Sequence, residues 1–115
     1  MSQPIEADLL ERLNELIETY LQHPDLDNAQ LAAHLHLSER NFYRRLRALT
    51  NDSPTQYVRN YRLDRVRALV AAGDYRTVNE LAHAVGFVNV GHFIRHYRER
   101  FGETPLESLR RHGWR

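Results

Sequence analysis

The chain has 115 residues, which is the size of one ordinary domain. It has no cysteine, so disulfide bonds and cysteine-based zinc sites are excluded. No apolar run approaches the roughly 20 residues of a membrane helix, and the first residues lack the basic and apolar regions of a signal peptide. We therefore expect a cytoplasmic protein.

The net charge of +1 hides an asymmetry along the chain. Residues 1–39 hold one arginine and eight acidic residues, a balance of −7, whereas residues 40–115 hold fifteen arginines and seven acidic residues, a balance of +8. All sixteen basic residues are arginine, the side chain best suited to forked contacts with phosphates and guanine. A solvated arginine-rich surface would give the same composition, so the placement of the arginines must decide between the two interpretations.

The spacing of apolar and capping residues predicts a chain built from helices. Apolar side chains recur at helical spacing between residues 9 and 21, which predicts an amphipathic helix ending before Pro24. Later helix starts are marked by candidate N-caps at Asp27, Ser38, Ser53, Thr77, Asn89 and Thr104. These signals predict an all-α fold of seven helices, with approximate spans 7–21, 28–35, 39–49, 54–72, 78–85, 90–100 and 105–111.

The chain also repeats itself. Leu31-Ala32 corresponds to Leu81-Ala82 at an offset of 50 residues, and Ser53-Pro54 corresponds to Thr104-Pro105 at an offset of 51, so the second copy has gained one residue in its turn. Each copy reads as a cap, a short helix, a tight turn and a second helix, which is the helix-turn-helix plan. The sequence thus predicts one domain over 1–115, with helix-turn-helix units at about 27–50 and 77–101 joined by a linker helix over 54–72.

The two predicted turns differ at one position. Gly86 supplies the left-handed backbone that a sharp turn often needs, whereas His36 takes that place in the first copy. A residue with a side chain is strained in that conformation, so we expect the first turn to differ slightly from the second.

The helix predicted over 39–49 has an apolar inner face and a basic outer face. Phe42, Leu46 and Leu49 form the inner face. The opposite face carries Arg40, Tyr43, Arg44 and Arg47. A solvated face with ion pairs is the alternative, but Glu39 is the only acidic residue of this helix. We therefore predict that this face reads bases in a major groove of DNA.

The helix predicted over 90–100 has a less polar outer face. Phe93, Tyr97 and Phe101 point inward, and the outward set is Val90, Gly91, His92, Arg95 and Arg98. Arg95 can read guanine, Val90 can touch a thymine methyl group, and Gly91 allows close approach. A surface histidine without a role is an equally good interpretation of His92 alone.

The length of the predicted linker helix is close to one turn of DNA. Nineteen residues span roughly 28 Å, close to the roughly 34 Å of one DNA turn, so the two outward-facing helices could enter successive major-groove segments. Of its arginines, we expect one or two to touch phosphates; the set is Arg59, Arg62, Arg65 and Arg67.

Three other classes of function are alternatives to DNA binding. The sequence offers no nucleophile elbow, glycine-rich phosphate loop or Cys-His pair, so we expect no enzyme, no catalytic residue and no cofactor. His92 and His96 share a helix face, but no HExxH pattern or acidic third ligand accompanies them, so we expect no metal site. A helical module that binds only protein is the best alternative to a DNA-binding domain.

The stretch NELAHAVGFVNVGHFIRHYRERFGETPLESLR, residues 79–110, resembles the signature of the AraC/XylS family of bacterial transcription regulators. Its marks are Leu81-Ala82, Gly86-Phe87, Phe93, Tyr97-Arg98, Phe101-Gly102, Thr104-Pro105 and Arg110, and the resemblance covers about 90 residues from Asp27 onward. It implies two helix-turn-helix units joined by a long helix that bind double-stranded promoter DNA, with RNA polymerase as a further partner. By position, the family's base-reading residues fall on Arg40, Tyr43, Arg44 and Arg47, and on Val90, Gly91, His92 and Arg95.

The sequence departs from the family pattern at a few positions, and its N-terminal part shows a second resemblance. His36 stands where the family frequently has glycine, and Gly91-His92 stand where it often has serine and an aromatic residue, which puts the base contacts of the second unit in question. The N-terminal part is similar to the output domains of two-component response regulators and hybrid sensor kinases. This implies a fragment whose receiver or sensor domain is absent. Because no long heptad seam is visible, we expect the isolated domain to be a monomer.

Overall fold

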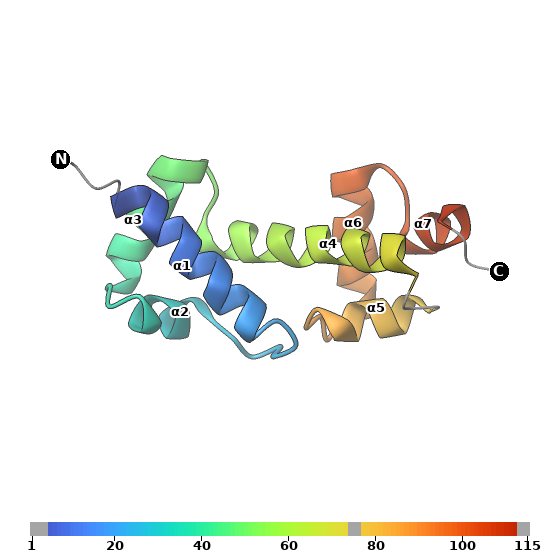
Figure 1. The fold of residues 1–115 in the computed structure, drawn as a ribbon, viewed down its shortest axis with the longest axis horizontal. Helices are drawn as coiled ribbons and strands as arrows, with labels where there is room; N and C mark the ends of the chain where they lie inside the picture. The colour runs from blue at the N-terminus through green and yellow to red at the C-terminus, as the bar shows by residue number, and fades with distance from the viewer. Residues whose placement is uncertain (1–4, 74–76, 113–115) are drawn as a thin grey trace. The chain divides into compact units, whose positions relative to one another are not determined.

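The computed structural model describes residues 5–73 and 77–112, and within them the chain forms seven α-helices and no strand (Figure 1). The helices are α1 (Ile5–Thr19), α2 (Asn28–His34), α3 (Glu39–Thr50), α4 (Pro54–Ala72), α5 (Val78–Ala84), α6 (Val90–Phe101) and α7 (Pro105–Arg111). The predicted all-α fold of seven helices is confirmed. No described helix has the length and apolar character needed to cross a bilayer.

Two compact units divide the chain. The first comprises the described part of Met1–Tyr20 together with Asp25–Arg59, and the second comprises Leu21–Pro24 together with the described part of Asn60–Arg115. The first turns of α4 therefore belong to the first unit and its remaining turns to the second. The short segment Leu21–Pro24, which follows α1 in the sequence, packs with the second unit.

The core of the first unit joins α1 to the pair formed by α2 and α3. Its buried apolar side chains are Leu9, Leu13, Ile17, Leu31, Ala32, Leu35, Phe42 and Leu46. At the start of α4, the Tyr57 hydroxyl donates a 2.6 Å hydrogen bond to Oδ1 of Asn14 on α1, and burial raises the pKa of this tyrosine. This bond satisfies a partly buried polar group, as a packed core requires.

The core of the second unit is built on α4, α5 and α6. Its buried apolar side chains include Leu63, Val66, Val70, Leu81, Ala82, Val85, Phe93, Tyr97 and Leu109. Aromatic rings stack along the inner face of α6, because Tyr97 lies 5.9 Å from Phe93 and 4.7 Å from Phe101 between ring centroids. The edge-on geometry of both contacts is the one that aromatic pairs favour.

The capping residues predicted from the sequence start the helices. Side-chain oxygens of Asp27, Ser38, Ser53, Thr77, Asn89 and Thr104 each accept a hydrogen bond from the backbone N–H three residues later. Asp27, Thr77 and Thr104 form complete capping boxes, in which the later side chain also accepts from the cap backbone. These local bonds fix where α2, α5 and α7 begin.

The two helix-turn-helix turns share a left-handed residue at the same position. His36 has a φ of 60° and Gly86 a φ of 88°, both left-handed. Leu37 N–H donates to the Ala32 carbonyl at 2.9 Å, and Phe87 N–H donates to the Ala82 carbonyl at 2.9 Å. The expectation of a different backbone at this position is therefore wrong, because His36 adopts the left-handed conformation that glycine adopts in the second turn. The turns differ instead in length, since the second has the additional residue Val88 before its cap Asn89.

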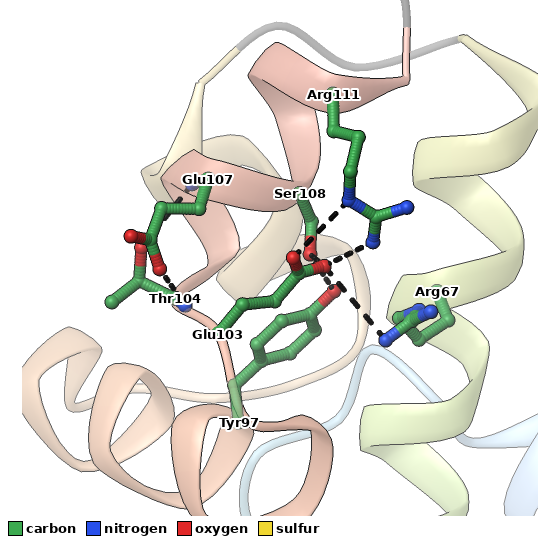
Figure 2. Close-up of polar contacts among 7 residues, drawn as sticks. All are labelled: Arg67, Tyr97, Glu103, Thr104, Glu107, Ser108 and Arg111. Atoms are coloured by element: carbon green, nitrogen blue, oxygen red, sulfur yellow. Dashed lines mark hydrogen bonds and ion pairs between the residues drawn. The ribbon is translucent and has the colours of Figure 1, made fainter.

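A polar network connects α6 to α7 (Figure 2), with Tyr97 and Ser108 buried and Arg111 exposed. The Tyr97 hydroxyl donates to Ser108 Oγ at 2.7 Å, and Ser108 donates in turn to a carboxylate oxygen of Glu103. Arg111 donates two hydrogen bonds to the same carboxylate, and Nη1 of Arg67 on α4 lies 3.9 Å from it. Hydrogen bonds from Arg111 and Ser108 lower the pKa of Glu103 to about 2.

Candidate DNA-binding interface

The predicted site residues of the first unit share the outward face of α3. Phe42 and Leu46 are fully buried and Leu49 is half-buried, which anchors the opposite face in the core. Arg40, Arg44 and Arg47 are exposed, and Tyr43 is 48% exposed. The structure thus brings together the four side chains that the sequence predicts, on one side of one helix.

Local hydrogen bonds order this face. Ser38 accepts from the Asn41 N–H at 3.1 Å, and Oδ1 of Asn41 accepts from Nη2 of Arg44 at 2.8 Å. Arg44 is therefore held by a neutral amide, which leaves its positive charge uncompensated. In the described part of the chain, neither Arg40 nor Arg47 forms an ion pair with a carboxylate. Such a face attracts a polyanion.

The predicted site residues of the second unit lie along α6. Gly91, His92, Arg95 and Arg98 are exposed, whereas Val90 is half-buried. Asn89 caps this helix by accepting from the His92 N–H at 2.9 Å. The residue gained in the second copy of the repeat is Val88, which is 71% exposed directly before the cap. This face is less basic than that of α3, as the sequence predicts.

A shallow hollow runs along the outward side of α6. It is lined by Gly91, Ile94, Arg95, Arg98, Glu99 and Thr104. A Cβ added at Gly91 would meet only Oδ1 of Asn89, at 3.3 Å, so the missing side chain leaves the helix backbone approachable. Two arginines at the edge of a hollow with accessible backbone suit a close-lying phosphate or sugar.

The arginines of α4 differ in how far they are buried. Arg62 is only 6% exposed and donates to two backbone carbonyls, those of Val85 and His23. Arg67 lies over the Phe101 ring at 4.6 Å and faces Glu103. Arg59 and Arg65 are half-buried. Burial therefore removes Arg62 from the predicted phosphate contacts, which stay a prediction for the other three arginines.

Sequence reasoning missed the residues that hold the second unit together. Arg62 shares a helix stripe with Val66 and Val70, four and eight residues on, and this register was the available signal that it points inward. Arg100 of α6 forms a two-pronged ion pair with Asp64 of α4, at 2.8 and 3.0 Å. No spacing rule on one helix could have identified that partner, because the pair joins separate helices.

The histidines do not form a metal centre within the described ranges. His96 Nδ1 lies 3.5 Å from Glu99 Oε1 on the same helix. No cluster of three or more potential ligands occurs among the described residues.

Known proteins resemble this chain over nearly its whole length. The family model described as "Helix-turn-helix domain" matches residues 31–111. The XylDLEGF operon transcriptional activator of Pseudomonas putida is 31% identical over 102 residues, which cover 87% of this chain and 32% of the activator. This chain therefore spans about a third of the length of that relative.

Two solved structures are also similar to this chain. A probable AraC family transcriptional regulator from Rhodopseudomonas palustris CGA009 is 31% identical, with a TM-score of 0.77, and the match covers 91% of this chain and 97% of that one. The DNA-binding domain of AdpA, a global transcriptional factor solved in complex with a target DNA, is 30% identical, with a TM-score of 0.79 and 90% of each chain covered.

These relatives are transcription regulators and their DNA-binding domains, not enzymes. The matched region runs from within α2 to the end of α7. The chain therefore belongs to the AraC/XylS family and is a helix-turn-helix DNA-binding domain of a transcription regulator.

Proposed function

We propose that the chain recognises a specific sequence in double-stranded promoter DNA, with α3 and α6 in successive major-groove segments. The observation that carries this proposal is the outward face of α3, where three exposed arginines and one exposed tyrosine lie together with no carboxylate partner among the described residues. Arginine forks match the N7 and O6 acceptors of guanine, and the tyrosine can contact a base edge or a phosphate.

The length of α4 supports two contacts on one side of the duplex. Its 19 residues measure roughly 28 Å, compared with roughly 34 Å for one DNA turn. The DNA-binding domain of AdpA, which matches 90% of this chain, was solved in complex with a target DNA. In this proposal the base-reading residues are Arg40, Tyr43, Arg44 and Arg47 of α3 and Val90, Gly91, His92 and Arg95 of α6, while Arg98 contacts the backbone.

The two helices have unequal roles in this proposal. Arg40, Arg44 and Arg47 offer long forked donors, so α3 specifies its bases sharply. On α6, His92 and Arg95 are the hydrogen-bonding base readers, and Val90 is half-buried. The hollow beside Gly91 brings the DNA backbone close to the helix without reading its sequence. The α6 half-site is therefore the looser one.

The setting of the domain is also a proposal. Because the chain spans about a third of the P. putida activator, we propose that it works as the cytoplasmic output domain of a longer regulator. The resemblance of its N-terminal part to two-component output domains suggests a receiver or sensor domain as the missing part. RNA polymerase is the expected protein partner once the domain is on a promoter. The isolated domain is a monomer, since the apolar stripe of α1 packs into its own core. Sedimentation showing a stable dimer at micromolar concentration would refute this last point.

An electrophoretic shift with random-sequence duplex, measured across salt concentrations, tests the electrostatic part of the proposal. With roughly five phosphate contacts, the slope of log affinity against log salt is expected to be about −4 to −5. A shift that is absent at low salt, or insensitive to salt, would favour a domain that binds only protein.

A further inference from the structure

A buried cation lies beside the turn of the second helix-turn-helix unit. Arg62 projects from α4, and its Nη1 donates to the Val85 carbonyl at 2.9 Å while its Nη2 donates to the His23 carbonyl at 3.1 Å. Val85 is the C-cap of α5, where backbone carbonyls lack partners within the helix and the helix dipole favours positive charge. One guanidinium therefore ties α4, the end of α5 and the segment Leu21–Pro24 to one another.

The turn itself is packed directly against this guanidinium. A Cβ on Gly86 would lie 1.9 Å from Arg62 Nη1 and 2.4 Å from the Leu21 carbonyl oxygen. The turn therefore approaches the arginine more closely than any residue with a side chain would permit. In the first unit the equivalent residue is His36, an exposed side chain in the same backbone conformation. At this position the two turns share a left-handed backbone and differ in what packs against it.

Burial makes this contact costly to break. Arg62 is 6% exposed, and burial lowers its pKa, although a guanidinium remains charged at any ordinary pH. Its Nε is buried without a hydrogen-bond acceptor among the described residues, so the two carbonyl contacts are the hydrogen bonds that offset its lost hydration. Moving the turn away would therefore leave the buried guanidinium without its carbonyl acceptor on Val85.

We propose that Arg62 is a positioning residue for DNA recognition: it holds the turn Val85–Asn89 against α4 and thereby fixes the direction in which α6 presents its outward face. The part concerning DNA rests on the proposed function above. The part concerning the turn does not, since it follows from the contacts of Arg62 alone.

Amide hydrogen exchange tests the positioning of the turn without DNA. In Arg62→Met, which keeps the length of the side chain but removes its donors, the Gly86 and Phe87 amides should exchange about tenfold faster or more. The His36 and Leu37 amides make the matching hydrogen bonds in the first unit and should not change. The Gly102 amide, bonded to the Arg98 carbonyl at 2.8 Å, reports on the rest of the second unit.

Two further variants separate positioning from general loss of stability. Val70→Ala removes buried apolar volume from the last turn of α4, and it should accelerate exchange throughout the second unit rather than at the turn alone. If Arg62→Met fails to fold, Arg62→Lys keeps the charge without the fork and should show the same local pattern. Equal exchange at Gly86 and Phe87 in wild type and a folded Arg62 variant would overturn the proposal.

Selection of bound sites from random duplexes tests the consequence for DNA. At a temperature where each variant is folded, Arg62→Met should lose sequence preference in the half-site read by α6 and retain it in the half-site read by α3. Val70→Ala should keep the sequence preference of the α3 half-site relative to that of the α6 half-site. A uniform loss across both half-sites in Arg62→Met would contradict the positioning role. If wild type selects no sequence, the proposed function fails, while the exchange experiment still decides the role of Arg62.

Discussion

His36 and Gly86 occupy equivalent positions in the two helix-turn-helix turns, and both have left-handed backbone conformations. The residue before each turn and the backbone hydrogen bonds across it also correspond, because His36 N–H donates to Ala33 and Gly86 N–H donates to His83. A residue with a Cβ is strained in this conformation whereas glycine is not. Substitutions at the two positions should therefore have opposite effects on the stability of the domain.

Replacing His36 by glycine should stabilise the domain. The change removes the left-handed penalty of about 1–2 kcal/mol, and the added flexibility of the unfolded chain offsets about 0.5–1 kcal/mol of it. The exposed histidine ring has no core packing to lose. Urea unfolding should show a net gain of about 0.5–1 kcal/mol. A loss of stability would mean that the His36 side chain makes a contact that outweighs the strain.

Replacing Gly86 by alanine should destabilise the second unit severely. The new Cβ would be strained by the positive φ and would also overlap the guanidinium of Arg62. Gly102→Ala is the matched control, because Gly102 has a φ of 77° and open space around it. Denaturant unfolding should show that Gly86→Ala costs about 1–3 kcal/mol more than Gly102→Ala. Equal costs for the two variants would show that the turn can move away from Arg62.

Much of the fold could be predicted because helix starts are encoded locally. Asp27, Thr77 and Thr104 cap the helices that follow them with bonds spanning three residues, so the sequence alone places those starts. The end of α1 was less accurate, predicted at residue 21 and found at Thr19. Leu21 is buried, but in the second unit rather than on α1, so its apolar character extended the helical pattern too far.

The candidate site could be predicted only in part. The outward faces of α3 and α6 follow from helical periodicity, and Val90 alone is half-buried where an exposed residue was expected. Periodicity places Arg62 on an inward stripe but does not give its role, because an arginine on an apolar stripe can turn its head to solvent or bury it on distant carbonyls. That choice depends on Val85 and His23, which lie 23 and 39 residues away.

Acid should weaken the network around Glu103. Its pKa is about 2 in the folded domain and about 4.5 when unperturbed, because Arg111 and Ser108 bond its ionised form. A lowered folded pKa gives stability that is complete above about pH 4.5 and is lost as pH falls through about 2. The stability difference between wild type and Glu103→Gln should therefore shrink across that window.

Unfolding in urea at about pH 7, 4 and 3 measures this difference. Glu11→Gln, which alters an exposed carboxylate on α1, is the control for the general effect of removing one negative charge. A difference between wild type and Glu103→Gln that stays constant through the window would show that the ionised carboxylate does not hold α7.

The two reading helices should respond differently to loss of one arginine. Arg44→Ala removes a forked donor from the more basic helix, and it should relax the preference in the sharply specified half-site, where one good base contact discriminates by about 1–3 kcal/mol. Arg95→Ala should weaken binding with a smaller effect on sequence preference, because the α6 face is less polar. Site selection with both variants tests the ranking, which would be reversed if Arg95→Ala erased more sequence information than Arg44→Ala.

The central claim is that this domain reads a DNA sequence with two helices of unequal specificity. Selection of bound sites from random duplexes by the purified wild-type domain tests it most directly. The account predicts two enriched blocks about 10 base pairs apart, one sharply specified and the other looser and containing thymine. Recovery of a single block, or of no enriched sequence from duplexes that the domain still binds, would contradict it.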